Sequence, residues 1–127
     1  ITPSSTSSKI LVDCNLVIGS SDSFGAYLFL LRGSTQIMLS DADGNRTRSS
    51  KYITTYAVSD GANQYKVGDV NIKYLDSPST TSATTYKIQS GHWNPGTIYL
   101  NRCHNNTNNA TYDGNSVSTI TLMEIAG

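Results

Sequence analysis

Apolar and polar residues alternate along most of the chain with the period of two that is typical of β-strands. In the run from Lys9 to Ile18, for example, every second residue is apolar. Gly, Asn, Asp, Pro and Ser separate such runs, and no stretch of ten residues follows a helical period. The pattern predicts strands over residues 9–18, 24–31, 35–39, 52–58, 65–75, 84–89, 97–103 and 117–125. Short strands at such close spacing indicate an all-β sandwich or barrel.

Two of these predicted strands, 24–31 and 117–125, are apolar on both faces. A strand of a two-layer sandwich normally buries one face and leaves the other in water. The second apolar face therefore predicts a contact outside the domain's own core, and we favour self-association. The alternative is a cover supplied by a loop or by a segment that precedes Ile1. The candidate interface residues are Tyr27, Phe29, Leu31, Ile120 and Leu122.

Length and charge narrow the class of protein. A chain of 127 residues predicts one domain, residues 1–127. Lys plus Arg number 9 and Asp plus Glu number 9, so the formal net charge is zero. This balance argues against nucleic acid and anionic membrane surfaces as partners, because both demand clustered positive charge. No apolar run approaches the ~20 residues needed to span a bilayer, so membrane insertion is not expected either.

The cysteines leave the redox compartment open. Cys14 lies in the apolar alternation of the first strand, which predicts an inert core thiol. Cys103 follows a predicted strand at the start of a polar loop. A disulfide between the two would need their Cα atoms to be close, which the sequence does not decide.

The residues that carry enzyme chemistry are sparse. The two histidines are His92 and His104. His104 directly follows Cys103, and adjacent side chains on a strand point to opposite faces, so the two would not form a dyad. The chain has a single Glu, and most Asp residues lie in turns, which argues against the paired carboxylates of a glycosidase. We therefore expect no enzyme activity and no cofactor.

Residues Asp41–Asn45 begin like a calcium loop, with oxygen-bearing side chains at alternate positions. The Gly falls one place early, however, and Tyr52 stands where a Glu would bind the ion. We favour a hairpin turn at Asp43–Gly44 without a metal, and calcium binding is the alternative. A small basic cluster follows, which we interpret as solvated loop charge or, alternatively, as an anion or subunit contact: Arg46, Arg48 and Lys51.

Two polar segments are candidate binding regions, the turn 91–96 and the Asn-rich loop 103–115. The sole tryptophan lies in the turn, where an exposed aromatic ring could stack on a sugar face; the alternative is a ring that covers a strand edge. The two segments flank strand 97–103, so we expect them at opposite ends of the domain, as competing sites. The candidate binding residues are His92, Trp93, Asn94, His104, Asn105, Asn106 and Tyr112.

Four strings together cover much of the chain in order: ITPSSTSSKILV (1–12), YLDSPSTTSATTYKIQ (74–89), TIYLNR (97–102) and STITLMEIAG (118–127). This combination resembles a domain that recurs in tail-fibre and virion structural proteins of bacteriophages, including phages of cyanobacteria. That domain usually lies at the C-terminus of a longer chain. Because this chain begins with Ile1-Thr2-Pro3, which is similar to the end of a strand, we expect it to be the C-terminal part of a longer fibre protein.

The resemblance implies an eight-stranded antiparallel jelly-roll sandwich, similar to the tumour-necrosis-factor fold, that forms a homotrimer. It also implies a place on the virion. The function we expect is the receptor-binding tip of a tail fibre, with a host-surface glycan or protein as partner besides other virion proteins. The alternative is a capsid-decoration or head-fibre trimer that stabilises the particle. A cellular lectin or cytokine-like ligand shares the architecture but not the four strings.

Overall fold

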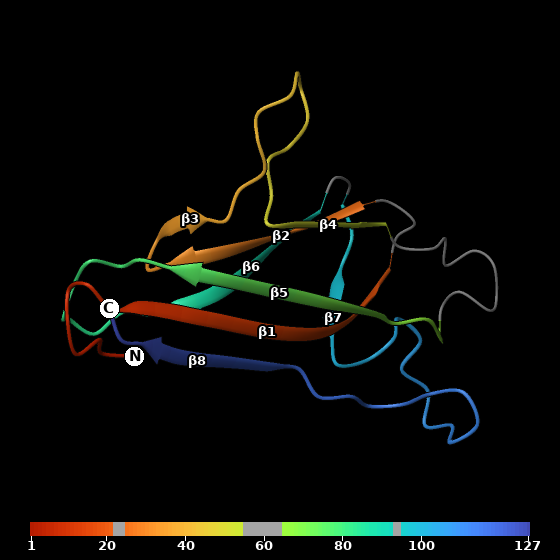
Figure 1. The fold of residues 1–127 in the computed structure, drawn as a ribbon. Helices are drawn as coiled ribbons and strands as arrows, with labels where there is room; N and C mark the ends of the chain where they lie inside the picture. Colours follow the sequence, from red (N-terminus) through yellow and green to blue (C-terminus); the bar gives the residue numbers. More distant parts are fainter. Residues whose placement is uncertain (22–24, 55–64, 93–94) are drawn as a thin grey trace.

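The computed structural model describes residues 1–21, 25–54, 65–92 and 95–127, and these form an all-β domain. Two antiparallel sheets face each other as a sandwich (Figure 1). The all-β prediction is confirmed, and each of the predicted runs overlaps an observed strand; Phe24 and residues 55–58 lie outside the described residues. No helix in the described part is long and apolar enough to cross a membrane. The strands are β1 (Lys9–Ser20), β2 (Gly25–Arg32), β3 (Thr35–Ile37), β4 (Lys51–Thr54), β5 (Gly68–Asp76), β6 (Tyr86–His92), β7 (Ile98–Leu100) and β8 (Thr119–Ile125).

The first sheet is built around β1, the longest strand. β5 follows one edge of β1 along most of its length, from the pair Ile10–Asp76 to the pair Ile18–Gly68. The other edge of β1 is shared, because β8 pairs with its first half and β7 with its last three residues. Both ends of β1 are therefore tied into the sheet, and the loop from β7 to β8 starts and ends beside this strand (Figure 1).

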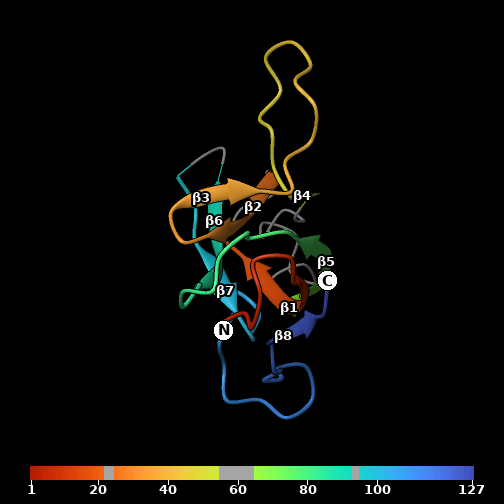
Figure 2. The ribbon, with the colours of Figure 1, turned by 60° about the vertical axis from the view of Figure 1, so that its left-hand side comes forward.

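The second sheet has the same plan around β2. β6 pairs with one edge of β2 from Ala26 to Arg32, and β3 and β4 share the other edge. Between β3 and β4 the chain leaves the sheet as a long hairpin, residues 38–50, which stands away from the sandwich (Figures 1 and 2).

The core lies between the two sheets and is formed by the alternate residues that the sequence pattern singled out. Ile10, Val12 and Ile72 of the first sheet and Leu28 and Leu30 of the second are at most 2% exposed. Shortening any of the Ile or Leu side chains among them to Ala is expected to cost about 2–5 kcal/mol of stability. Cys14 belongs to the same cluster, as predicted, and both cysteines are free thiols.

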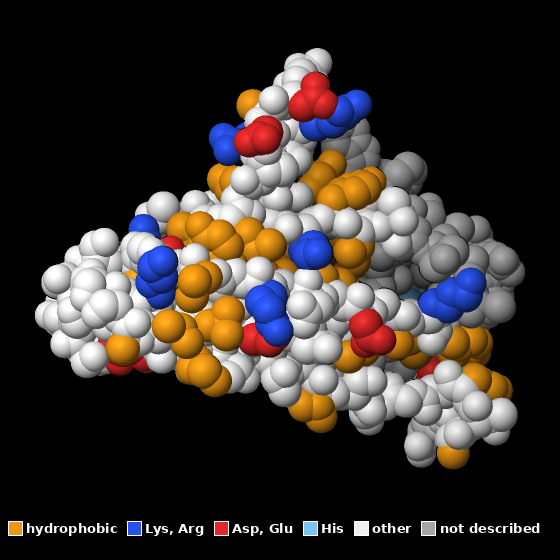
Figure 3. All heavy atoms as spheres, viewed as in Figure 1, with side chains coloured by type: hydrophobic (Ala, Val, Ile, Leu, Met, Phe, Trp, Pro, Cys, Tyr) orange, Lys and Arg blue, Asp and Glu red, His pale blue; other side chains and the backbone are white. Residues whose placement is uncertain are grey.

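β8 is apolar on both faces, as the sequence predicted. Leu122 pairs with buried Val12 and packs against the core. The next residue, Met123, points to the outer face of the sheet, where it pairs with Leu11 and is 53% exposed. Leu75 pairs with Leu11 from the other side and is 46% exposed. Figure 3, which looks onto this outer face of the first sheet, shows hydrophobic side chains gathered over these strands.

The five candidate interface residues do not share one face. Ile120 and Leu122 lie on the core side of β8, where their partners on β1 are buried. Tyr27, Phe29 and Leu31 alternate with the core residues of β2, and so lie on the outer face of the second sheet. Their role in an interface stays a prediction. The exposed apolar residues that accompany them on β8 are Met123 and Ile125.

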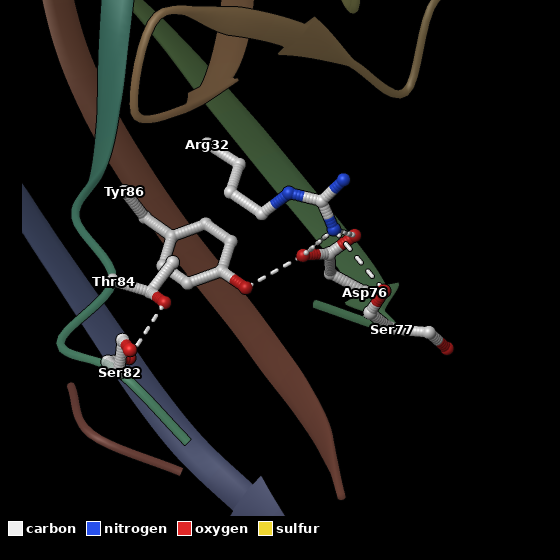
Figure 4. A network of polar contacts seen from close by, with 6 residues as sticks. All are labelled: Arg32, Asp76, Ser77, Ser82, Thr84 and Tyr86. Atoms are coloured by element: carbon white, nitrogen blue, oxygen red, sulfur yellow. Dashed lines mark hydrogen bonds and ion pairs between the residues drawn. The ribbon is translucent and has the colours of Figure 1, made fainter. Parts of the chain in front are cut away.

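A buried polar network joins the sheets at one end of the sandwich (Figure 4). Asp76, at the end of β5, is only 4% exposed. Its carboxylate accepts hydrogen bonds from β2 and β6, two paired strands of the second sheet. Arg32 Nη1 lies 3.0 Å from each carboxylate oxygen and also donates to the Ser77 carbonyl. The Tyr86 hydroxyl donates from the other side at 2.6 Å. The charge of Asp76 is therefore satisfied inside the protein.

Candidate functional site

The loop that joins β7 to β8 is closed at its neck by hydrogen bonds. Asn101 has a positive φ of 66°, a conformation that asparagine tolerates better than most residues, and its N–H donates to the Val17 carbonyl at 2.8 Å. On the return side, Ser116 N donates to the Asn101 carbonyl, and Ser118 Oγ donates to Asn101 Oδ1 at 2.6 Å. Val17 N in turn donates to Ser118 Oγ. The neck therefore fixes both ends of the loop to β1.

The interior of the loop is organised around the buried Cys103. Its thiol lies 3.2 Å from the Asn105 carbonyl oxygen and 3.1 Å from an Asp113 carboxylate oxygen. The other oxygen of Asp113 accepts from the Thr107 hydroxyl, and this bond is the main reason that the pKa of Asp113 is lowered. Burial, and then the Asp113 carboxylate, raise the pKa of Cys103. The first residues of the loop also pack tightly on β1, since a methyl group at Gly19 would lie 2.9 Å from the Cys103 Cα.

An aromatic pair lies at the end of this loop. The rings of Tyr65 and Tyr112 are 4.6 Å apart between centroids and inclined by 58°. Asn105 Nδ2 donates to the Tyr65 hydroxyl at 3.0 Å, so the loop amide holds the pair in place. Tyr112 remains 51% exposed. A tilted tyrosine pair of this kind presents a ring surface together with hydroxyl groups, which suits a ligand with apolar and polar faces.

A second aromatic pair lies where the loop leaves β7. His104 Nδ1 is 3.2 Å from the Tyr99 hydroxyl, and the two ring centroids are 5.5 Å apart. The Arg102 guanidinium carbon lies 4.1 Å above the centre of the Tyr99 ring, which is cation–π geometry. Arg102 Nη1 also donates to the Cys103 carbonyl at 3.1 Å. The loop therefore carries a fixed cation, two ring pairs and several amides.

The structure brings together three of the predicted binding residues: His104, Asn105 and Tyr112 all belong to these contacts. Asn106 is exposed and lines a shallow cavity of about 160 Å³ in the same loop. His92 is the last residue of β6 and lies beside Ser20, with Nε2 3.3 Å from its hydroxyl. Ser20 pairs with the first residue of β7, whereas the loop follows the end of that strand. Trp93 and Asn94 lie outside the described residues.

Sequence reasoning missed three members of this site: Tyr65, Tyr99 and Arg102. Tyr99 and Arg102 lie in or just after the strand that leads into the loop, so their nearness to His104 was a signal that could have been used. Tyr65 comes from a distant segment just before β5, and nothing in the sequence pairs it with Tyr112. The Cys103 thiol faces Asp113, whereas the His104 imidazole faces Tyr99.

Comparisons with protein families, with curated proteins and with solved structures found no match to this chain. Function is therefore inferred from the loop, from the exposed faces of the sandwich and from the strings described above.

Proposed function

We propose that this domain is a bacteriophage virion appendage module, the receptor-binding tip of a tail fibre that attaches the particle to a host-surface glycan or protein. The observation that carries the proposal is the Tyr65–Tyr112 pair, held by Asn105 on a loop whose neck is closed by hydrogen bonds. Exposed aromatic rings on a fixed support give large contact area at a low cost in conformational entropy. The proposed role is binding.

The jelly-roll topology and the homotrimer belong to the same proposal. Two facing antiparallel sheets, with the first and last strands paired, are compatible with that class of sandwich. The outer face of the first sheet supports self-association, because Leu75, Met123 and Ile125 are exposed there around the half-buried Leu11, and a monomer would leave these side chains in water. Three copies would also present three loops, and the avidity of such an arrangement lets each single site be weak.

The second candidate is a capsid-decoration or head-fibre trimer that contacts other virion proteins and stabilises the particle. The apolar outer face of the first sheet favours it as much as it favours a fibre tip. The loop that joins β7 to β8 is the feature that distinguishes the two candidate functions. A structural trimer has no use for a fixed tyrosine pair with one exposed ring, Tyr112, on this loop, whereas a receptor-binding tip does.

The experiment that tests the proposal places the domain on the particle by electron microscopy with antibodies raised against it. Label at the tail tip is expected, and label on the capsid would overturn the proposal in favour of the structural trimer. At the tail tip, Tyr112→Ala should slow adsorption to host cells, because it removes the exposed ring of the pair. Tyr112→Phe keeps the ring and should adsorb nearly normally, and Val117→Ala is the control, because the Val117 side chain is 78% exposed.

A further inference from the structure

The hairpin 38–50 is fixed where it leaves the second sheet. Ser50 is buried at its base and accepts a hydrogen bond from Leu30 N at 2.8 Å. Further out, Arg48 Nε donates to the Ser40 carbonyl at 2.6 Å across the hairpin, and the turn at Gly44 has a φ of +53°. The predicted turn at this position is present. The hairpin therefore projects from the second sheet, away from the sandwich, on fixed ends (Figures 1 and 2).

A groove of about 750 Å³ lies where the hairpin meets the sheet, lined by hairpin residues and by residues of β2 and β4. Its floor contains Tyr27 and Tyr52, which face each other across β2 and β4, with ring centroids 5.1 Å apart and inclined by 40°. Tyr52 is 55% exposed. Its ring lies directly over the backbone of Gly25, where an added methyl group would overlap it. The absent side chain at Gly25 thus allows the ring to lie against the sheet and to present its other side to the groove.

The charges around the groove cancel. Two acidic side chains, Asp41 and Asp43, and two basic ones, Arg46 and Lys51, line it, so its formal charge is zero. Asp43 and Arg46 form an ion pair with each other. Asn45 and several serine and threonine residues add amide and hydroxyl groups. A lining of this kind offers hydrogen bonds to a polar ligand and has no net attraction for an anion or a cation.

We infer that this groove binds a neutral saccharide. A sugar ring has an apolar face of C–H groups, which stacks on an aromatic ring, and an edge of hydroxyl groups, which needs both donors and acceptors. The tyrosine floor supplies the first requirement, and the side chains of the hairpin supply the second. The volume lies within the ~300–1,000 Å³ of small-molecule sites. The inference rests on the proposed function in one respect, the source of the saccharide, which would be the host surface. The groove is a second site, separate from the loop that joins β7 to β8.

The test uses saturation-transfer difference NMR on the whole domain. The neutral probes are the methyl glycosides of glucose, galactose, mannose, rhamnose and N-acetylglucosamine, and the anionic probes are sialyllactose and a sulfated disaccharide. At least one neutral probe should bind, with a dissociation constant on the order of 1 mM.

Tyr52→Ala should weaken that binding about tenfold or more, whereas Tyr52→Phe keeps the ring and most of the affinity. Gly25→Ala should also weaken it, because the new methyl group displaces the Tyr52 ring. Val117→Ala, an exposed substitution elsewhere, should leave it unchanged.

Each contrary outcome has a distinct meaning. The inference would be overturned if no neutral probe binds at a concentration about ten times the expected dissociation constant. Binding of the anionic probes alone would overturn it too. Equal affinity of the wild type and a folded Tyr52→Ala variant would do the same. If saccharide binding survives Tyr52→Ala but is lost with Tyr112→Ala, the groove is not the site, and the attachment function stands. If Tyr52→Ala abolishes saccharide binding while label lies on the capsid, the groove inference holds and the proposed function fails.

Discussion

The hydroxyl of Tyr86 lies 2.6 Å from a carboxylate oxygen of Asp76, and this hydrogen bond joins the two sheets inside the protein. Asp76 ends β5 in the first sheet, and Tyr86 begins β6 in the second. The guanidinium of Arg32 completes the contact at 3.0 Å, with about a third of its side chain exposed. Both oxygens of this deeply buried carboxylate therefore have donors inside the protein, so its hydrogen-bonding capacity is satisfied without water.

Replacing Asp76 by Asn should lower the free energy of unfolding by on the order of 3 kcal/mol, because Arg32 then loses its counter-charge. This value is at the lower end of the range for a broken buried ion pair, since water reaches part of the Arg32 side chain. Urea denaturation followed by circular dichroism measures the change. Asp69→Asn is the matched control, because Asp69 lies on the same strand but is exposed, and it should change stability by less than about 0.5 kcal/mol. Equal stability of the two variants would contradict the role of the network.

Stability at alkaline pH should depend on Tyr86. Burial, and then the hydrogen bond to Asp76, raise the pKa of Tyr86 well above its ordinary value. Because the folded pKa is the higher one, the contribution of the phenol is complete below its unfolded pKa of about 10 and declines as the pH rises further. The melting temperature of the wild type should therefore fall more steeply above pH 10 than that of Tyr86→Phe. Parallel curves for the two proteins would show that Tyr86 is not the group responsible.

The strands and the core could be predicted from the sequence because alternation is a local property. Every second residue of β1 was assigned to the interior, and the structure buries Ile10, Val12 and Cys14 there. The turn at Asp43–Gly44 could also be predicted, because turn preference is likewise a property of neighbouring residues. Contacts between distant segments had no such signal. Nothing in the sequence places Tyr65 against Tyr112 or brings the hairpin and Tyr52 to one groove, since both arrangements depend on how the strands pair.

Strand pairing also explains why the faces of β8 could not be assigned in advance. The sequence offers two apolar sets on this strand, and alternation treats them alike. Only the register with β1 decides between them, because it sets Leu122 opposite buried Val12 and Met123 opposite the partly exposed Leu11. A shift by one residue would exchange the two sets.

Both thiols should be unreactive in the folded protein. Burial raises the pKa of Cys14, and burial together with the Asp113 carboxylate raises the pKa of Cys103, so little thiolate forms at neutral pH. Iodoacetamide at pH 7.5, followed by mass spectrometry, should modify neither cysteine in the native protein and both in denaturant. Asp113→Asn should increase the reactivity of Cys103 alone, because it removes the nearby negative charge and loosens the loop. Rapid alkylation of native Cys103 would contradict the buried arrangement.

The two faces of β8 should respond differently to the introduction of a charge. Wild-type protein should form a trimer at micromolar concentration, measured by light scattering after size-exclusion chromatography. Met123→Asp places a charge on the outer apolar face beside Leu11 and Leu75, so it should give a folded monomer with an unchanged circular dichroism spectrum. Leu122→Asp points toward the core instead and should unfold the domain, since an unpaired buried charge costs several kcal/mol.

Val117→Asp is the control for charge alone, because Val117 is 78% exposed and lies before the strand, and it should remain trimeric and folded. A trimer that persists in Met123→Asp would move the interface away from the outer face of the first sheet and toward the outer face of the second, where Tyr27 and Phe29 lie. A wild-type monomer would remove self-association altogether. The exposed apolar residues of β5 and β8, among them Leu75 and Met123, would then need a partner other than a second copy of this chain.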